Sequence, residues 1–467
     1  SRKSLYFVYN NPDERLLPFT RSRRVIEEPG ISRINLTTGP QSITGSTRMQ
    51  ATTIETWVVG TVLATALDGA LRTVLSPKEM ARLGFGPEPT PLRERLLRFA
   101  ALHEEVRKTV PALADLTALE ADTYAAGRFS TTFAAEGLIT VFIDGTERSP
   151  TFRLYPLDTV DEAKRKCWIR VWTPAPDLGS AWRAFLGRPF RGLSAGLYQK
   201  PFEEEIEDPY LRTAALESLK RAGDDQQGKY DFSFAEPNIV KRGPGRGDLG
   251  VAIALGAEAE GLGDEASPFR AFLKLFADKD ARSALILAGG SIRDAAGLRE
   301  SLFRKGLLPK SSPFVQIGVG AENDPLRLGE QVALKMLLNA HSTAVMARLG
   351  KVVGNTMVNV STSNLKLVGR ATSLILMHIN DALGRPEWVR LYGRRKPISY
   401  GEANAVLFDA ISYLKTKRKE AGQTAEVAFS IIRILESLRR KNPVPHEEAL
   451  KITAETGLGP YLSKLFQ

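Results

Sequence analysis

Residues 328–371 read LGEQVALKMLLNAHSTAVMARLGKVVGNTMVNVSTSNLKLVGRA, and this stretch decides the fold. In its first part, apolar residues recur with helical spacing on more than one face, at Val332, Leu334, Met336, Leu337, Leu338, Val345, Met346 and Leu349. A helix that is apolar on several faces is buried between neighbours. We therefore expect a buried helix here.

A glycine-containing break follows this helix. Gly350 and Gly354 interrupt the pattern, and Arg348, Lys351 and Asn355 flank them. Cationic and amide groups at a turn suit a phosphate or a carboxylate. A favourable charge at a helix end explains Lys351 equally well, so both interpretations stay open.

The composition is that of a soluble globular protein large enough for two or more domains. The chain has 467 residues, of which 43% are hydrophobic and 25% are charged. The single cysteine, Cys167, excludes an intramolecular disulfide and a thiolate metal cluster, and it fits the reducing cytoplasm. The four histidines show no short ligand spacing, so we expect no metal. We also expect no cofactor, because the Gly-x-Gly patterns lack a preceding strand and a following helix.

The net charge of +11 indicates attraction to anions. The basic runs at 394–396, 415–419 and 439–441 lack interleaved aromatic residues, which favours solvated helix faces over a nucleic-acid surface. A phosphorylated small molecule is then the better partner. We expect no membrane span, since no run reads as long and apolar enough, and no signal peptide opens the chain.

A second informative stretch lies near the start. A hydroxyl-rich segment, Thr44 to Thr47, precedes a predicted helix that carries Arg48 in its first turn, with Ser46 or Thr47 as N-cap. Such a helix start is a candidate contact for an oxyanion or phosphate. A plain capped helix accounts for it as well.

Several of these motifs together resemble one family, the sugar isomerase (SIS) domain proteins that include N-acetylmuramic acid 6-phosphate etherases and glucokinase regulatory proteins. The similar segments are Thr38-Gly39-Pro40-Gln41, residues 45–50, Ser342-Thr343, residues 348–352, Gly354-Asn355 and residues 364–367. The resemblance is long and dense, so it outweighs a lone short motif. Two charged positions of the family signature are amides here, Gln41 and Gln50.

The resemblance implies an α/β fold with tandem SIS domains. Each would be a flavodoxin-like three-layer α/β/α sandwich around a parallel sheet, the first one partial, followed by a C-terminal helical cap. We expect the C-terminal part of a first SIS domain at 1–75, a helical linker at 76–125, a second SIS domain at 126–385 and the cap at 386–467. The predicted strands are 5–9, 131–135, 166–171, 284–288 and 314–319, and residues 174–250 are expected to be loops and short helices.

The segment from Asp144 to Phe152 resembles an etherase motif, and on that match Glu147 stands where the etherases keep an acid-base glutamate. A carboxylate there could move a proton at carbon or protonate a leaving oxygen. The alternative is a surface glutamate paired with an arginine. The family's first phosphate loop is reduced to residues 134–137, where Glu136 would repel a phosphate.

Two further candidates are weaker. Ser291 follows the predicted strand 284–288 and precedes a helix at 294–305, where a hydroxyl could contact a phosphate, although an ordinary βα turn is the favoured interpretation. His341 could assist sugar-ring opening, but a buried histidine with satisfied ring nitrogens explains it better.

The resemblance implies a sugar-phosphate-binding protein. The lost loop and the two amides favour a regulatory or sensor protein with a protein partner resembling a sugar kinase, or a homo-oligomer. The alternative is a lyase or isomerase acting on a phosphosugar, with Glu147 as acid-base and a cytoplasmic location in either case. The predicted ligand-binding residues are Ser46, Thr47, Arg48, Ser291, Arg348, Lys351 and Asn355.

Overall fold

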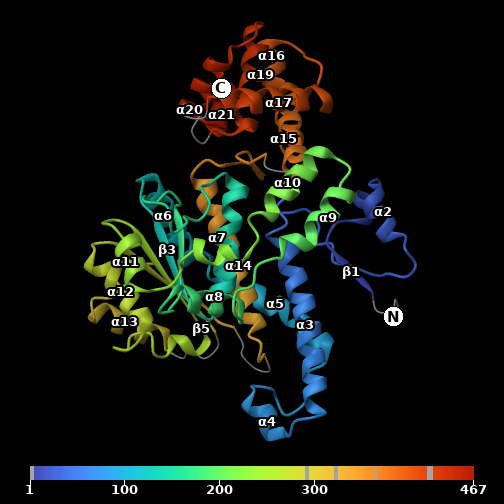
Figure 1. Ribbon diagram of the computed structural model, residues 1–467. Helices are drawn as coiled ribbons and strands as arrows, with labels where there is room; N and C mark the ends of the chain where they lie inside the picture. Colours follow the sequence, from blue (N-terminus) through green and yellow to red (C-terminus); the bar gives the residue numbers. More distant parts are fainter. Residues whose placement is uncertain (1–4, 290–293, 320–323, 363–364, 418–423, 467) are drawn as a thin grey trace.

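The computed structural model describes residues 5–289, 294–319, 324–362, 365–417 and 424–466 (Figure 1). Its centre is one parallel sheet in the order β4-β3-β5-β6-β7. Numbered along the chain, that order is 2-1-3-4-5, the doubly wound order of flavodoxin-like sheets. The α/β prediction is confirmed. The strands are β3 (Ser130–Ala134), β4 (Ile169–Trp172), β5 (Leu249–Leu255), β6 (Arg282–Ala288) and β7 (Phe314–Ile317).

The central strand β5 was absent from the sequence prediction, which assigned loops and short helices to residues 174–250 and no strand between residues 171 and 284. All seven of its residues, LGVAIAL, are buried. A strand covered on both faces of a parallel sheet reads as a continuous apolar run without alternation, and β5 has that pattern. The signal was therefore present in the sequence and was overlooked.

Helices cover both faces of the sheet and make the three layers that were predicted. One face packs against α6 (Val110–Ala125), α7 (Leu138–Phe152), α8 (Leu178–Leu186) and α14 (Leu328–Arg348). The other packs against α11 (Glu236–Arg242), α12 (Pro268–Asp278) and α13 (Ala295–Arg304). The buried helix expected from residue 328 onward is α14, which packs against α6 and α7 (Figure 1).

The N-terminal part is a small unit beside the sheet. A separate parallel pair is formed by β1 (Tyr6–Tyr9) and β2 (Ser32–Asn35), with α1 (Asp13–Leu16) and α2 (Thr20–Ile26) between them. The long helix α3 (Gln50–Arg72) and α4 (Pro77–Arg82) follow, and α5 (Leu92–Lys108) leads into α6. Two strands do not make a second SIS sheet, so the tandem arrangement and the domain boundaries stay predictions.

By length and composition α3 is long and apolar enough to cross a membrane, so the expectation that no such run exists is wrong. The helix nevertheless makes polar contacts with protein. Asp68 is buried and pairs with Arg72 at 2.7 Å and with Arg95 of α5 at 2.8 Å. The indole N–H of Trp57 donates to the carbonyl of Leu96 at 3.1 Å. These contacts are those of a helix that packs on α5.

The C-terminal helices form a core of their own (Figure 1), which also includes the helix at 365–384 that the sequence prediction placed at the end of the second SIS domain. Ser399 caps the helix at 400–416 in a capping box with Glu402. A short antiparallel hairpin of β8 (Val352–Val353) and β9 (Thr356–Met357) connects α14 to this part. The helices are α15 (Leu365–Gly384), α16 (Pro386–Tyr392), α17 (Tyr400–Thr416), α19 (Glu426–Arg440), α20 (His446–Thr456) and α21 (Leu458–Leu465).

The remaining segment between β4 and β5 contains short helices, as the sequence predicted for that region. They are α9 (Ala195–Glu205), α10 (Pro209–Leu219) and the 3-10 helix η2 (Asp224–Lys229). A further 3-10 turn, η3 (Gly256–Ala259), follows β5 directly and lies at the carboxyl edge of the sheet.

A substitution at Leu334 tests whether α14 is packed in the core of the protein. The Leu334 side chain is fully buried in the core, so we expect Leu334→Ala to lower the free energy of unfolding by about 2–5 kcal/mol, through lost burial and the cavity left behind. The same change at Leu63, which is 61% exposed on α3, should cost no more than about 0.5 kcal/mol. Urea unfolding followed by tryptophan fluorescence measures both, and equal losses would contradict this packing.

Candidate functional site

A buried polar network joins the N-terminal signature to α7 and α14. Arg48 is 5% exposed, and its guanidinium donates to Asp144 at 2.9 Å, Ser342 at 2.8 Å and Thr343 at 3.0 Å. Asp144 also accepts from the amide of Asn339 at 2.9 Å. Both terminal nitrogens of Arg48 thus donate to protein groups, which makes Arg48 a residue that holds the site together.

The network continues toward α6 through a second arginine. Arg148 lies one helical turn after Asp144 on the same face of α7 and donates to it at 3.0 Å. Arg148 also pairs with Glu120 of α6 at 2.8 Å. Burial raises the pKa of Glu120, but Arg148 and His341 outweigh burial and hold that pKa well below its usual range. Both carboxylates are therefore ionised.

His341 belongs to this network. Its Nδ1 lies 3.0 Å from the Thr117 hydroxyl, and its Nε2 lies 2.5 Å from Glu120. With both ring nitrogens occupied in a buried place, His341 is a satisfied core histidine, the account that the sequence favoured.

Lys335 is the residue that sequence reasoning missed. It lies on the face of α14 that also carries Asn339 and Ser342. Its ammonium donates to the Arg48 carbonyl at 2.7 Å, to Thr53 at 2.9 Å and to Asn339 at 2.9 Å. Burial lowers the pKa of Lys335 to about 8. A lysine in a buried helix, spaced four and seven residues before Asn339 and Ser342, was the sequence signal that could have revealed it.

Glu147 lies on the same face of α7 as Asp144 and Arg148, and its side chain is partly buried. Burial raises the pKa of the Glu147 carboxyl, while the nearby charges of Arg48 and Lys335 act in the opposite direction. A carboxyl group with a raised pKa near a lysine with a lowered pKa is the kind of arrangement that general acid–base chemistry uses.

A cavity of about 440 Å³ lies beside these groups, within the size range of small-molecule sites. It is lined mainly by apolar side chains from α3, α5 and α14. Thr38, Ser42 and Gln50 of the signature region also line it. Thr53 and Asn339 line it too, and both bind the Lys335 ammonium, so this cation lies directly behind the wall of the cavity.

The carboxyl edge of the sheet, where α/β proteins of this order usually bind ligands, is occupied by a carboxylate. Glu258 accepts from the backbone N–H of Glu136 at 3.1 Å and from that of Leu255 at 2.8 Å. Those N–H groups would otherwise be available to a phosphate. Burial raises the pKa of Glu258 and also that of Glu330 nearby. Among the described residues, the part of this edge at β3 and β5 is therefore unsuited to a phosphate, in keeping with the reduced loop at 134–137.

The other predicted residues lie around the signature loop and the β8–β9 hairpin. The backbone N–H of Thr44 donates to the Asn355 carbonyl at 2.8 Å, which brings the loop of Ser46 and Thr47 to the hairpin. Lys351 lies over the Trp168 ring at 5.8 Å, and burial lowers its pKa.

Two predicted ligand-binding residues are not placed at this site. Arg348 is exposed and pairs with Asp122 at 3.2 Å. Ser291 lies outside the described residues. Within the described ranges, no three His, Cys, Asp or Glu side chains are grouped as metal ligands.

Comparison with known proteins gives one consistent result. The chain is similar to N-acetylmuramic acid 6-phosphate etherases. It is 38% identical to that of Clostridium acetobutylicum over 97 residues, 21% of this chain and 30% of the relative. It is 59% identical to that of Parasynechococcus marenigrum over 49 residues, 10% and 16% of the two chains. It is 48% identical to that of Bacillus subtilis over 61 residues, 13% and 20%.

The chain therefore spans less than a third of the length of each of these relatives. No protein-family model matches it. The matches support the relation to SIS-domain proteins that the motifs indicated. They give no support to a closer likeness to glucokinase regulatory proteins.

The charge of Asp144 can be tested by pH. Replacing Asp144 with Asn leaves Arg48 and Arg148 without their shared counter-charge, and we expect a loss of about 3 kcal/mol at pH 7. Burial raises the pKa of Asp144, but the charges of Arg148 and Arg48 lower it by more, so the net shift is downward. The carboxylate then contributes stability above its unfolded pKa of about 4 and loses it as the pH falls through the lower folded pKa.

The difference in urea midpoint between the wild type and Asp144→Asn should therefore shrink as the pH falls below about 4. The exposed Asp278→Asn on α12 serves as a matched control, and its difference from the wild type should stay small throughout. A difference for Asp144→Asn that is constant with pH would contradict an ionised, paired Asp144.

Proposed function

We propose that the protein acts on a phosphorylated sugar and cleaves an ether bond in it, with Glu147 as the acid-base group. The observation that carries this proposal is the position of Glu147 and Lys335, which lie close enough for the charge of each to act on the pKa of the other, while burial raises the pKa of Glu147 and lowers that of Lys335. The relatives are named as etherases of N-acetylmuramic acid 6-phosphate, so that compound is the proposed substrate.

The chemistry needs one group that can both take and give a proton. Elimination of an ether removes a proton from carbon, forms a carbon–carbon double bond and breaks the carbon–oxygen bond. The departing oxygen leaves with the bonding electron pair and takes up a proton. A carboxyl group whose pKa lies nearer neutral pH than usual can accept the first proton and deliver the second, and Lys335 can stabilise its ionised form.

Lys351 is the proposed phosphate contact among the predicted residues. Its side chain is partly buried, and among the described residues the structure gives its ammonium no hydrogen-bond acceptor. The signature loop of Ser46 and Thr47 and the hairpin of Asn355 lie next to each other, which supports a shared role. Arg48, whose donors bind protein groups, is proposed to position this loop.

A phosphosugar sensor without turnover is the second candidate. The observation that favours it is the Glu258 carboxylate, which occupies the backbone N–H groups at the carboxyl edge of the sheet. The relatives' names favour the catalytic alternative over this regulatory one, which the sequence had put first.

We also propose a partner resembling a sugar kinase or a second copy of the chain, a cytoplasmic location, and a first SIS domain ending near residue 75. The last is supported by a repeated order, since strand β2, a loop and the long helix α3 repeat the order of β7, a loop and α14.

Glu147→Gln tests the proposal directly. We expect turnover of N-acetylmuramic acid 6-phosphate to fall by about 100-fold to 10,000-fold, because the amide cannot transfer the proton. The rise in melting temperature caused by the same sugar phosphate should persist, since the amide keeps the shape of the side chain. Product formation measured by mass spectrometry and a thermal-shift titration provide the two readouts.

Glu217→Gln, the same change at an exposed site on α10, is the matched control and should retain full turnover. If the sugar phosphate stabilises the wild-type protein but no product forms, the result would favour the phosphosugar sensor over the enzyme. The absence of any phosphate-dependent stabilisation would overturn both candidates.

A further inference from the structure

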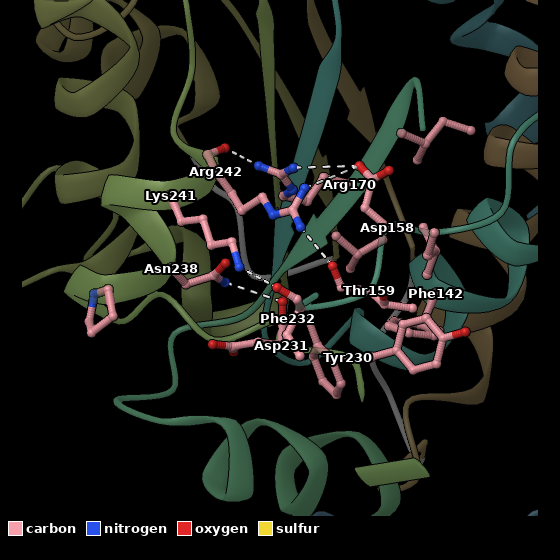
Figure 2. A pocket seen from close by; sticks show the side chains of 15 residues that line it. Phe142, Asp158, Thr159, Arg170, Tyr230, Asp231, Phe232, Asn238, Lys241 and Arg242 are labelled. Atoms are coloured by element: carbon pink, nitrogen blue, oxygen red, sulfur yellow. Dashed lines mark hydrogen bonds and ion pairs between the residues drawn. The ribbon is translucent and has the colours of Figure 1, made fainter. Parts of the chain in front are cut away.

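A cationic pocket, separate from the apolar cavity described above, lies beside the outer strand β4 and away from the carboxyl edge of the sheet. It has a volume of about 160 Å³ and is enclosed by β4, the segment 157–160, the segment 230–232 and α11 (Figure 2). Arg170 is the second residue of β4, and Arg242 is the last residue of α11, seven residues before β5 begins. Both therefore lie toward the amino ends of the strands, opposite the usual ligand edge.

The two guanidinium groups are buried and short of counter-charge. Arg170 and Arg242 are each 8% exposed. Their common carboxylate is Asp158, whose Oδ2 lies 3.9 Å from Arg170 and 3.8 Å from Arg242, beyond hydrogen-bond distance. The other oxygen of Asp158 already accepts the backbone N–H groups of Lys166 at 2.9 Å and Cys167 at 3.1 Å. One carboxylate therefore faces two guanidinium groups without binding either closely.

Each of these arginines also has a donor nitrogen without a partner. Within the described part of the chain, Nη2 of Arg170 and Nη1 of Arg242 are buried and make no hydrogen bond. The other terminal nitrogen of each is used, because Nη1 of Arg170 donates to the Arg242 carbonyl, and Nη2 of Arg242 donates to the carbonyls of Thr159 at 2.6 Å and Glu162 at 2.5 Å. The unpartnered nitrogens are the same two that face Asp158.

The arrangement is electrostatically unfavourable as it stands. Burial lowers the pKa of Arg170, and repulsion from Arg165 and Arg242 lowers it further. A buried charged donor without an acceptor costs free energy, and two like charges close together add to that cost. An anion placed between the two guanidinium groups would satisfy both open nitrogens and remove the repulsion.

We propose that this pocket binds a phosphate group, either free or carried by a small molecule. Guanidinium groups bind phosphate oxygens with paired, charge-assisted hydrogen bonds, and two of them converge here. Lys241 lies at the exposed rim, and its ammonium donates to the Val160 carbonyl, so a third cation stands at the entrance (Figure 2). Apolar walls from Phe142, Val171 and Phe232 leave room for a short organic part on the phosphate.

The site is independent of the proposed catalytic group and of Lys351. Its cations come from β4 and α11, whereas Glu147 and Lys335 lie on α7 and α14. Variants on the two sites therefore separate the two proposals. The probes are inorganic phosphate and fructose 6-phosphate, with chloride at equal ionic strength as the reference.

Titration calorimetry and thermal shift on the full chain provide the test. The wild type should bind phosphate, while Arg170→Met and Arg242→Lys should bind it at least about tenfold more weakly, the loss expected for one charge-assisted hydrogen bond. In chloride alone, Arg170→Met should melt at or above the wild-type temperature, because the change removes one of two repelling buried charges. If Arg170 were merely structural, the Arg170→Met protein would instead have a lower melting temperature than the wild type in both salts.

Lys241→Met, at the exposed rim, keeps the test valid if the buried variants do not fold, and it too should weaken phosphate binding. Lys279→Met, an exposed lysine after α12, should leave it unchanged. Tighter binding of fructose 6-phosphate than of inorganic phosphate would identify an organic phosphate as the ligand, and equal binding would identify the free ion.

Three results would overturn the proposal. The first is no phosphate response beyond that of chloride. The second is equal binding by the wild type and the Arg170, Arg242 and Lys241 variants. The third is a response that disappears in Lys351→Met but persists in Arg170→Met, which would assign the phosphate to the other site.

Discussion

The ionised carboxylate of Asp144 is the constraint on which the rest of the arrangement depends. It is buried, and it is held by two guanidinium groups, a side-chain amide and a hydroxyl that come from three separate parts of the chain. A buried charge is tolerated only when its partners are complete. The partners therefore fix the N-terminal signature against α7 and α14, and with it the positions of Glu147 and Lys335.

The fold was predictable where a pattern is local. The helical spacing of residues 332–349 gives α14, and Ser399 with Glu402 gives the start of α17. The strand β5 carried an equally clear apolar run but lies after a long polar segment, and it was missed for that reason. The size of the N-terminal unit could not be predicted, because family resemblance implies a domain without showing how much of it this chain forms.

The candidate site was predictable only in part, because its partners are joined through space. Glu147 and Arg48 could be named from motifs, but the contact between Arg48 and Asp144 spans 96 residues. Arg48 was expected to meet a phosphate, and its guanidinium instead donates to Asp144, Ser342 and Thr343. Lys335 could not be assigned a role until the helix α7 was seen to face it. Charge pairing across distant elements leaves no periodic trace in a sequence.

The carboxylates at the carboxyl edge of the sheet have a consequence for the protein's acid–base behaviour. Glu258 and Glu330 have raised pKa values, so they take up protons as the pH falls from neutral, and the folded state gains stability. Asp144 and Glu120 have lowered pKa values and take that gain away at stronger acidity. The joint contribution of these four carboxyls to folding is therefore greatest at acidic pH, between the range in which the first two gain protons and the lower range in which the last two do.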